Sequence, residues 1–495
     1  MAVIKNSKDL YRFVPTGFTT LDIMFGENIR DPKTFELTSI NRGFELGTQG
    51  LIAGEQGTGK STLALDAATF AINMGFPCHK VIVIDADGTV YKENRIRNLS
   101  SIENPEEKIS VYSPLDVVED MWDVLVKEDE EYKSHNYKPV EFFNPLINRK
   151  VKMMPYTVVI IDTVTSLRAS LYSGDKTIKG AKDIFANEGS LQDNKQMARL
   201  CKSLSGLFDG NVAYIWVAHL KPNVSIDGTP PSRDFKSAPI DKKISAPKVL
   251  KQKVSWALVL YKTIDTTDRE KHAQKENVIT RLNLETSLAP FSVLARFWKS
   301  RTGTEAQTIT ELPNVATKFD RLYNLIIDCD NLGVFKKGTG MYPSADNPHI
   351  FKDKDEASSK IMSSFKREAR VMDGYDRPFN LMEARVLMDY TGNNEELIKR
   401  KIKFLSCCMQ NLENRLSYEL EVNNKTSEEL EENVDKLKNL FNLLGKIERV
   451  DVLDPNKVNM ESTASMVDAD IANEGNNSNY TVESSNGGDD DFDEW

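Results

Sequence analysis

The chain has 495 residues, 40% of them hydrophobic, which is typical of a globular protein with about two to four domains. Its formal net charge of −10 arises at one end: ten carboxylates and no Lys or Arg follow Lys457, and the rest holds 64 acidic and 64 basic residues. Net charge therefore does not exclude a nucleic-acid partner. The lack of a long apolar run argues against a membrane span.

The N-terminus and the cysteines indicate where the protein acts. Residues 1–14 form a polar leader without the apolar core of a signal peptide. The five cysteines show neither metal-site nor disulfide spacing: Cys78, Cys201, Cys329, Cys407 and Cys408. Scattered thiols are typical of a reducing compartment, so we expect a cytoplasmic protein, or one in the host cytoplasm if the source is a virus.

Residues 15–316 alternate between apolar runs and amphipathic stretches. The runs at 51–55, 80–87, 156–162 and 211–219 are rich in β-branched residues and predict strands buried on both faces. Helix-like segments lie between them. This order predicts an α/β core with a mainly parallel sheet flanked by helices. Residues 127–154 interrupt the pattern and are expected to form a surface insertion.

The rest of the chain is charged and mostly polar. Residues 317–453 predict a small C-terminal domain with a helical extension, in which 380–452 forms packed helices. Residues 454–495 predict a disordered acidic tail. Its ending, DDDFDEW, is either a solubilising tail or a peptide that docks Phe492 and Trp495 on a basic partner, such as a replication or recombination protein.

The stretch GEQGTGKS, residues 54–61, fits the phosphate-loop pattern between a predicted strand and a predicted helix. In this pattern glycines allow backbone N–H groups to face phosphates, Lys60 reaches the β- and γ-phosphates, and Ser61 binds Mg²⁺. The alternative is a glycine-rich turn. The predicted nucleotide-binding residues are Gly54, Glu55, Gln56, Gly57, Thr58, Gly59, Lys60, Ser61 and Thr62.

Acidic residues end two of the apolar runs. Asp162 follows YTVVII and is expected to support Mg²⁺, or else to cap a helix. Asp85 and Asp87 follow KVIVI, and we favour Asp87 as the carboxylate that orients the attacking water. Tyr91 either stacks on the nucleotide base or is a plain surface tyrosine.

The ordered set of motifs over residues 12–370 resembles the RecA-type recombinases, including their bacteriophage UvsX-like members. The segments that carry the likeness are VPTGFTTLDIMFG, GEQGTGKSTLALDAA, VIVIDADGT, VVIIDTVTSL and ARFWKSRTGT. The resemblance implies a RecA-like ATPase core that uses ATP and Mg²⁺. It also implies that Lys299 and Arg301 reach ATP on a neighbouring subunit, and that His219 stands where the family has a glutamine that senses the γ-phosphate.

Three features depart from the family pattern. Asp87 replaces a longer glutamate, His219 replaces the glutamine, and the leader before Val14 is shorter than the family's N-terminal helix. These departures put in question the rate of hydrolysis, the sensing of the γ-phosphate and the form of the subunit contacts.

Two segments are expected to face single-stranded DNA. They are 168–190 and 220–253, and the second holds eight Lys or Arg against three Asp. A solvated lysine-rich loop is the alternative, and aromatic residues for base stacking are few. The predicted DNA contacts are Arg168, Lys176, Lys179, Lys182, Lys221, Arg233, Lys236, Lys242, Lys243 and Lys248.

The sequence therefore predicts a DNA-dependent ATPase for homologous recombination and repair. It would form a homo-oligomeric filament on single-stranded DNA and pair that strand with homologous duplex, without a membrane partner. Two alternatives remain open, a ring helicase with the same ATPase core and a DNA-binding scaffold that ATP only switches.

Overall fold

The structure, a computed structural model, describes part of the chain. The described residues are 10–30, 33, 37–88, 91, 96, 102, 104–147, 149–167, 200–223, 233–235, 238–239, 241–262, 292–300, 309–315, 318–337, 370–379, 381, 384, 387–388, 390 and 392–417. The chain divides into two compact units, Met1–Arg449 and Val450–Trp495. The predicted acidic tail and residues 1–9 of the leader lie outside the described residues.

A ten-stranded sheet forms the centre of the first unit, in the order β16-β15-β14-β13-β5-β11-β10-β6-β7, with β12 beside β11. Six neighbouring strands run parallel: β13 (Trp256–Lys262), β5 (Gln49–Gly54), β11 (Val212–Pro222), β10 (Tyr156–Asp162), β6 (Cys78–Asp85) and β7 (Ile109–Tyr112). The antiparallel strands are β12 (Lys242–Ser245), β14 (Ser292–Ser300), β15 (Ile309–Val315) and β16 (Lys318–Phe319). The predicted mainly parallel α/β core is confirmed.

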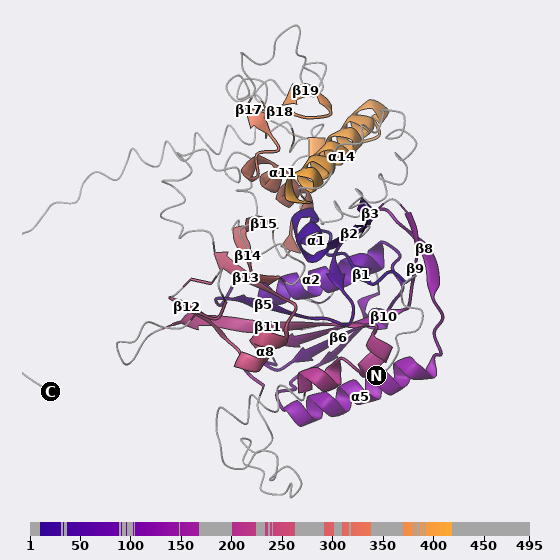
Figure 1. The fold of residues 1–495 in the computed structure, drawn as a ribbon, viewed down its shortest axis with the longest axis vertical. Coiled ribbons are helices and arrows are strands. Elements are labelled where there is room, and N and C mark those ends of the chain that lie inside the picture. The colour runs from indigo at the N-terminus through magenta and orange to yellow at the C-terminus, as the bar shows by residue number, and fades with distance from the viewer. Residues whose placement is uncertain are drawn as a thin grey trace, which may run out of the picture. The chain divides into compact units, whose positions relative to one another are not determined.

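Helices cover both faces of this sheet (Figure 1). Helix α2 (Lys60–Asn73) lies on one face, and α5 (Val118–Ser134) and α8 (Lys248–Lys253) lie on the other. Alternate residues of each strand serve the two cores, so Ile52 packs with α2 whereas Leu51 packs with α5 and α8. This is why β5 and β10 are buried at every position. Short helices α4 (Pro105–Lys108) and η3 (Leu207–Gly210) complete this part.

Residues 127–154 form the predicted surface insertion only in part, because some of them enter the core. Their first part continues α5, where Tyr132 is buried and its hydroxyl donates to the Pro155 carbonyl at 2.7 Å. The remainder forms the hairpin of β8 (Val140–Asn144) and β9 (Arg149–Met153), and Met153 is fully buried in the core on the α2 side. Polar residues dominate the segment because one face of α5 and of β9 meets solvent, which hides the buried face from a composition-based prediction.

The N-terminal part adds short elements to the same core. These are β1 (Phe13–Val14), α1 (Thr19–Phe25), β2 (Glu27–Arg30), β3 (Leu37–Asn41) and β4 (Phe44–Glu45). Strand β1 pairs with β4, and β2 pairs with β3. In the described part of the chain, no helix has the length and apolar character that crossing a membrane requires.

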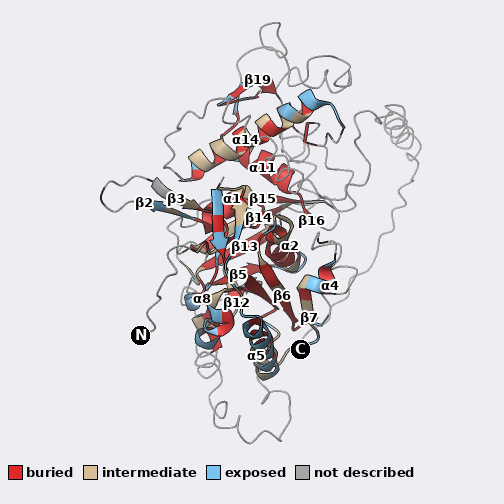
Figure 2. Cartoon of the chain, turned by 90° about the vertical axis from the view of Figure 1, so that its right-hand side faces the viewer, coloured by how far each residue is buried: buried red, intermediate tan, exposed pale blue. Residues whose placement is uncertain are grey.

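The C-terminal part has its own core, built by α11 (Arg321–Asn331), α14 (Glu395–Ser417) and the small sheet of β17 (Lys336–Lys337), β18 (Arg370–Met372) and β19 (Tyr375–Phe379). Phe335, Phe379 and Phe404 meet there. Figure 2 shows the central strands buried, whereas α14 has buried and exposed faces. The predicted helices of 380–452 thus include α14, and residues 418–452 lie outside the described residues.

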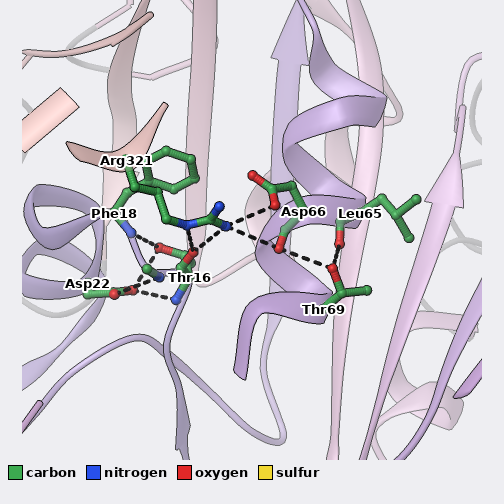
Figure 3. Close-up of polar contacts among 8 residues, drawn as sticks. Thr16, Phe18, Asp22, Leu65, Asp66, Thr69 and Arg321 are labelled. Carbon is green, nitrogen blue, oxygen red and sulfur yellow. Dashed lines mark hydrogen bonds and ion pairs between the residues drawn. The ribbon is translucent and has the colours of Figure 1, made fainter. Parts of the chain in front are cut away.

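A buried arginine joins the start of α11 to helix α2 and to the N-terminal segment (Figure 3). The Arg321 guanidinium pairs with the Asp66 carboxylate at 3.0 Å and donates to the Thr16 carbonyl from Nε and Nη2. It also lies between two aromatic rings, 4.6 Å from the Phe18 centroid and 4.5 Å from the Phe70 centroid. The C-terminal part is therefore anchored to the helix that follows the phosphate loop.

Candidate nucleotide site and basic pocket

The phosphate loop connects β5 to α2. Gly57 and Gly59 have φ angles of 73° and 77°, in the left-handed region that favours glycine. A Cβ on Gly54 would lie 2.5 Å from the Thr58 hydroxyl oxygen, so the loop is too tight for a larger residue there. In the described structure, α2 begins without a side-chain cap or an acidic residue in its first turn. Its backbone N–H groups and its positive dipole end therefore suit an anion.

The Lys60 side chain folds back along the loop. Its Nζ donates to the Glu55 carbonyl at 2.8 Å, and the Thr58 hydroxyl donates to the same oxygen at 2.9 Å. Lys60 is buried, whereas Glu55, Gln56 and Gly57 are exposed. The amine thus lies over the curled backbone, where a phosphate would be within its reach.

Asp162 ends β10 beside the start of α2. It is buried, and its Oδ2 accepts a hydrogen bond from the Tyr91 hydroxyl at 2.9 Å. Burial raises the pKa of this carboxyl and the Asp87 charge adds to the rise, while Ser61, Tyr91 and Lys60 oppose it. Within the described residues, no hydrogen bond of ordinary geometry reaches Oδ1. A buried carboxylate oxygen without a partner, next to a serine hydroxyl, fits a hard cation such as Mg²⁺.

No group of three or more His, Cys, Asp or Glu in the described ranges forms a metal cage. Mg²⁺ in phosphoryl-transfer sites is held by one or two protein oxygens together with phosphates and waters, so Ser61 and Asp162 are a sufficient protein set.

Asp85 and Asp87 have different roles in the turn after β6. Asp85 is buried and accepts hydrogen bonds from the Gly88 N–H at 3.0 Å and the Ser113 hydroxyl at 2.9 Å, so it shapes the turn. Asp87 is exposed and accepts a hydrogen bond from the Ser166 hydroxyl. The exposed carboxylate is therefore the one available to a substrate, and Ser166 orients it. The sequence marks Ser166 only by its place in the turn after Asp162, which does not predict its contact with Asp87.

His219 lies on β11, in register with Gly54 of β5. It is half-buried, and its backbone N–H donates to the Thr165 hydroxyl at 3.4 Å. Burial and the nearby Lys60 charge lower the pKa of His219, against the opposing charge of Asp87. Lys60, Asp87, Asp162 and His219 thus gather at the carboxyl ends of four neighbouring parallel strands.

Tyr91 differs from the predicted base-stacking residue. Its ring is buried, its hydroxyl donates to Asp162, and its backbone N–H donates to Asp85 Oδ2 at 3.4 Å. A ring held in this way offers no open face to a base, and its hydroxyl instead supports the Asp162 carboxylate.

A basic pocket of about 480 Å³ lies on the sheet face opposite α2. Its lining includes Phe235, one carboxylate, Asp234, and five cationic side chains, those of Arg233, Lys243, Lys248, Lys251 and Lys299. Lys251 and Asp234 form a buried ion pair at 2.5 Å. The predicted DNA contacts Arg233, Lys243 and Lys248 therefore share one cavity, whereas Lys221 is exposed on β11.

Lys299 belongs to β14, and its side chain reaches the C-terminal end of α8. Its Nζ donates to the carbonyls of Lys251 at 3.0 Å and Gln252 at 2.8 Å, which neutralises the negative end of that helix. It also lies 5.9 Å from the centroid of the Phe235 ring. Arg301, Arg168, Lys176, Lys179, Lys182 and Lys236, which the sequence also predicts as contact residues, lie outside the described residues.

Lys242 contacts the phosphate loop rather than the basic pocket. Its Nζ lies 2.7 Å from Glu55 Oε1. The structure therefore joins a residue predicted for DNA binding to one predicted for nucleotide binding.

Comparison with known proteins gives likenesses to solved structures. No family model matches the chain, and no curated protein is significantly similar to it in sequence. Among solved structures, that of the RadB recombinase is similar at 13% sequence identity and a TM-score of 0.33, over 56% of this chain and 92% of that chain. The geometry of the site itself is therefore the basis for a function.

Proposed function

We propose that the protein is a DNA-dependent ATPase of the RecA type, with the UvsX-like recombinases as its model, which assembles on single-stranded DNA and pairs it with homologous duplex. One observation carries the proposal: Lys60, Asp87 and Asp162 meet at the ends of neighbouring strands around a loop shaped for phosphates. A cation, a water-orienting carboxylate and a metal-site carboxylate in this arrangement are what ATP hydrolysis requires.

Phosphate binding would begin with the loop. Lys60 would turn from the Glu55 carbonyl to the β- and γ-phosphates, and the N–H groups of α2 would face the same oxygens. Ser61 and the unpartnered oxygen of Asp162 would hold Mg²⁺, which neutralises charge that develops on the transferring phosphoryl group. Tyr91 would keep the Asp162 carboxylate in place.

Hydrolysis would use Asp87 and His219. The Asp87 carboxylate, oriented by Ser166, would accept a proton from a water whose oxygen attacks the γ-phosphorus as the bond to the bridging oxygen breaks. His219 has a lowered pKa because of burial and Lys60, so it would be neutral near pH 7 and would hydrogen-bond the γ-phosphate edge rather than carry charge there.

Nucleic-acid contact would involve the basic pocket and its surroundings. Arg233, Lys243 and Lys248 place positive charge in one cavity, which suits the sugar–phosphate backbone. Lys299, with Arg301, would act on ATP held by a neighbouring subunit, and it would have to leave the α8 carbonyls to do so. Hydrolysis would then depend on assembly.

The deciding experiment is electron microscopy of the protein on long circular single-stranded DNA with Mg²⁺ and a slowly hydrolysed ATP analogue. Continuous filaments would support the recombinase, and strand exchange would be the next assay. Discrete rings would indicate the helicase, and bare DNA beside nucleotide-bound protein would indicate the switched scaffold. Lys60→Ala should abolish nucleotide binding and every assembly.

The role of Lys299 has its own test. Lys299→Ala should lose DNA-stimulated turnover but keep nucleotide binding, because its amine serves the neighbour's ATP. Lys152→Ala, which removes an amine exposed on β9, is the matched control and should keep wild-type turnover. Normal turnover of Lys299→Ala would remove the trans assignment.

A further inference from the structure

The Glu55–Lys242 ion pair connects two parts of the molecule that the sequence separates by 187 residues. The side chains are 49% and 31% exposed, respectively. The pKa of Lys242 is raised, chiefly by its hydrogen bond to Glu55. Exposed pairs contribute little to folding stability, so this one can break and re-form without unfolding its surroundings.

Glu55 makes its contacts through two groups at once. Its carbonyl accepts hydrogen bonds from Lys60 and Thr58, while its carboxylate pairs with Lys242. Lys60 is the residue that must reorient toward phosphates in the proposed ATPase. Any such movement takes a partner away from the Glu55 carbonyl, and bound phosphates place several negative charges near the Glu55 carboxylate. The phosphate charges repel the Glu55 carboxylate and attract the Lys242 amine, which weakens the hold of Glu55 on Lys242.

Lys242 is the first residue of β12, and the next residue lines the basic pocket. Successive side chains of a strand point to opposite faces, so Lys242 faces the phosphate loop and Lys243 faces the pocket. Strand β12 continues toward α8, whose last carbonyls hold Lys299. A change at Lys242 therefore acts directly on the strand that carries pocket residues.

We infer that the Glu55–Lys242 pair is a coupling contact: bound triphosphate releases Lys242 from Glu55, and the release repositions β12 and the basic pocket. Lys242 is then a positioning residue, not a phosphate contact of nucleic acid. The inference rests on the proposed function, which supplies the nucleotide. It goes beyond that function by naming the contact through which nucleotide binding affects β12.

Hydrogen–deuterium exchange tests the transmission without nucleic acid. Residues 242–253 are compared before and after addition of the ATP analogue and Mg²⁺. The wild type should change its exchange in this segment, and Glu55→Gln and Lys242→Gln should not. The same change in all three proteins, or none in the wild type with nucleotide bound, would overturn the inference.

Affinity for a labelled oligodeoxythymidine, with and without the analogue, measures the consequence. The ratio of the affinity with the analogue to the affinity without it should be about fivefold smaller in Glu55→Gln and in Lys242→Gln than in the wild type. The double variant should show no further fall in this ratio. Lys253→Gln is the control, because this exposed lysine ends α8 in the same segment, and it should keep the wild-type ratio. Equal weakening of Lys242→Gln with and without nucleotide would mean that Lys242 contacts DNA directly, which contradicts the inference. If the wild type shows the exchange response but binds no oligonucleotide, the coupling contact stands and the proposed function fails.

Discussion

Arg321→Met is expected to destabilise the protein strongly, because it removes the Arg321 cation from the buried Asp66 carboxylate. The Arg321 and Asp66 side chains are only 5% and 2% exposed. Removal of one partner of a buried ion pair costs about 3 to 5 kcal/mol, since an uncompensated charge remains in the interior. The Thr16 carbonyl, which Arg321 reaches at 3.0 Å and 3.2 Å, also loses both donors (Figure 3).

The two ring contacts add to this loss. A guanidinium over an aromatic face contributes about 0.5 to 2 kcal/mol, and Phe18 and Phe70 flank Arg321 on both sides. These contributions are not additive, so we expect a total of about 4 kcal/mol. Arg321→Lys keeps the charge but loses the planar group that donates twice to Thr16, and about half of that loss is expected.

Urea denaturation followed by the fluorescence of the buried Trp216, Trp256 and Trp298 measures the effect. The double variant Arg321→Met with Asp66→Asn should recover about 2 kcal/mol of the single-variant loss, because the stranded charge is gone. Arg415→Met is the control, since this exposed residue of α14 donates to the exposed end of α11 at the Leu332 carbonyl, and it should change stability by less than about 0.5 kcal/mol. A loss below about 1 kcal/mol in Arg321→Met, or simple additivity in the double variant, would refute the reasoning.

Three further predictions follow from buried groups. Burial raises the pKa of Asp328 to about 7 from an ordinary value of 3.8, so the stability that this group contributes is fully present below about pH 4 and is lost as pH rises through 7. Asp328→Asn should therefore reduce the change in the free energy of unfolding over that pH range by up to about 4 kcal/mol. An unchanged pH profile would contradict this. Gly59→Ala should cost about 2 to 3 kcal/mol of stability, because its φ is 77° and the new Cβ would lie 2.7 Å from the Phe319 ring. The control Gly75→Ala has a similar φ of 81° but nothing close to the new Cβ, so it should cost only about 1 kcal/mol. Equal losses would show that the clash with Phe319 adds nothing. Burial raises the pKa of Cys78 and Cys201 to about 12 and of Cys407 to about 11. Native protein at pH 8 should therefore react slowly with Ellman's reagent, and all five thiols should react only in urea. Fast labelling of any thiol in the native protein would contradict this.

Local patterns were sufficient to predict the sheet and the glycine-rich loop between β5 and α2, whereas phosphate binding by that loop stays a prediction. Both faces of the central strands are buried, so consecutive residues of each strand are apolar and the strand can be recognised from its sequence alone. These strands are β5, β6, β10 and β11. The loop needs glycines at fixed spacing for its left-handed turns, so its sequence is also diagnostic. Asp162 and Asp87 follow from strand ends alone.

Contacts between distant residues could not be predicted in this way. Tyr91 meets Asp162 across 71 residues, and no local pattern distinguishes that tyrosine from one that stacks on a base. Asp129 accepts a hydrogen bond from the Phe208 N–H across 79 residues, which draws a charged part of α5 into the interior. A charged residue that is buried with a partner cannot be distinguished from a surface residue by sequence alone. This is why all of 127–154 is predicted to be a surface insertion.

Three of the contacts that the phosphate loop and its helix make with later parts of the chain differ in strength. Gly59 packs against the buried ring of Phe319, and Asp66 pairs with buried Arg321, so the C-terminal part cannot separate from α2 without a loss of several kcal/mol. The Glu55–Lys242 pair is exposed, and its loss costs about 1 kcal/mol or less. When nucleotide binding rearranges the loop, the contact that costs least free energy to break should be the one that breaks. Movement should therefore pass to β12 and the basic pocket, while α11 stays fixed to α2.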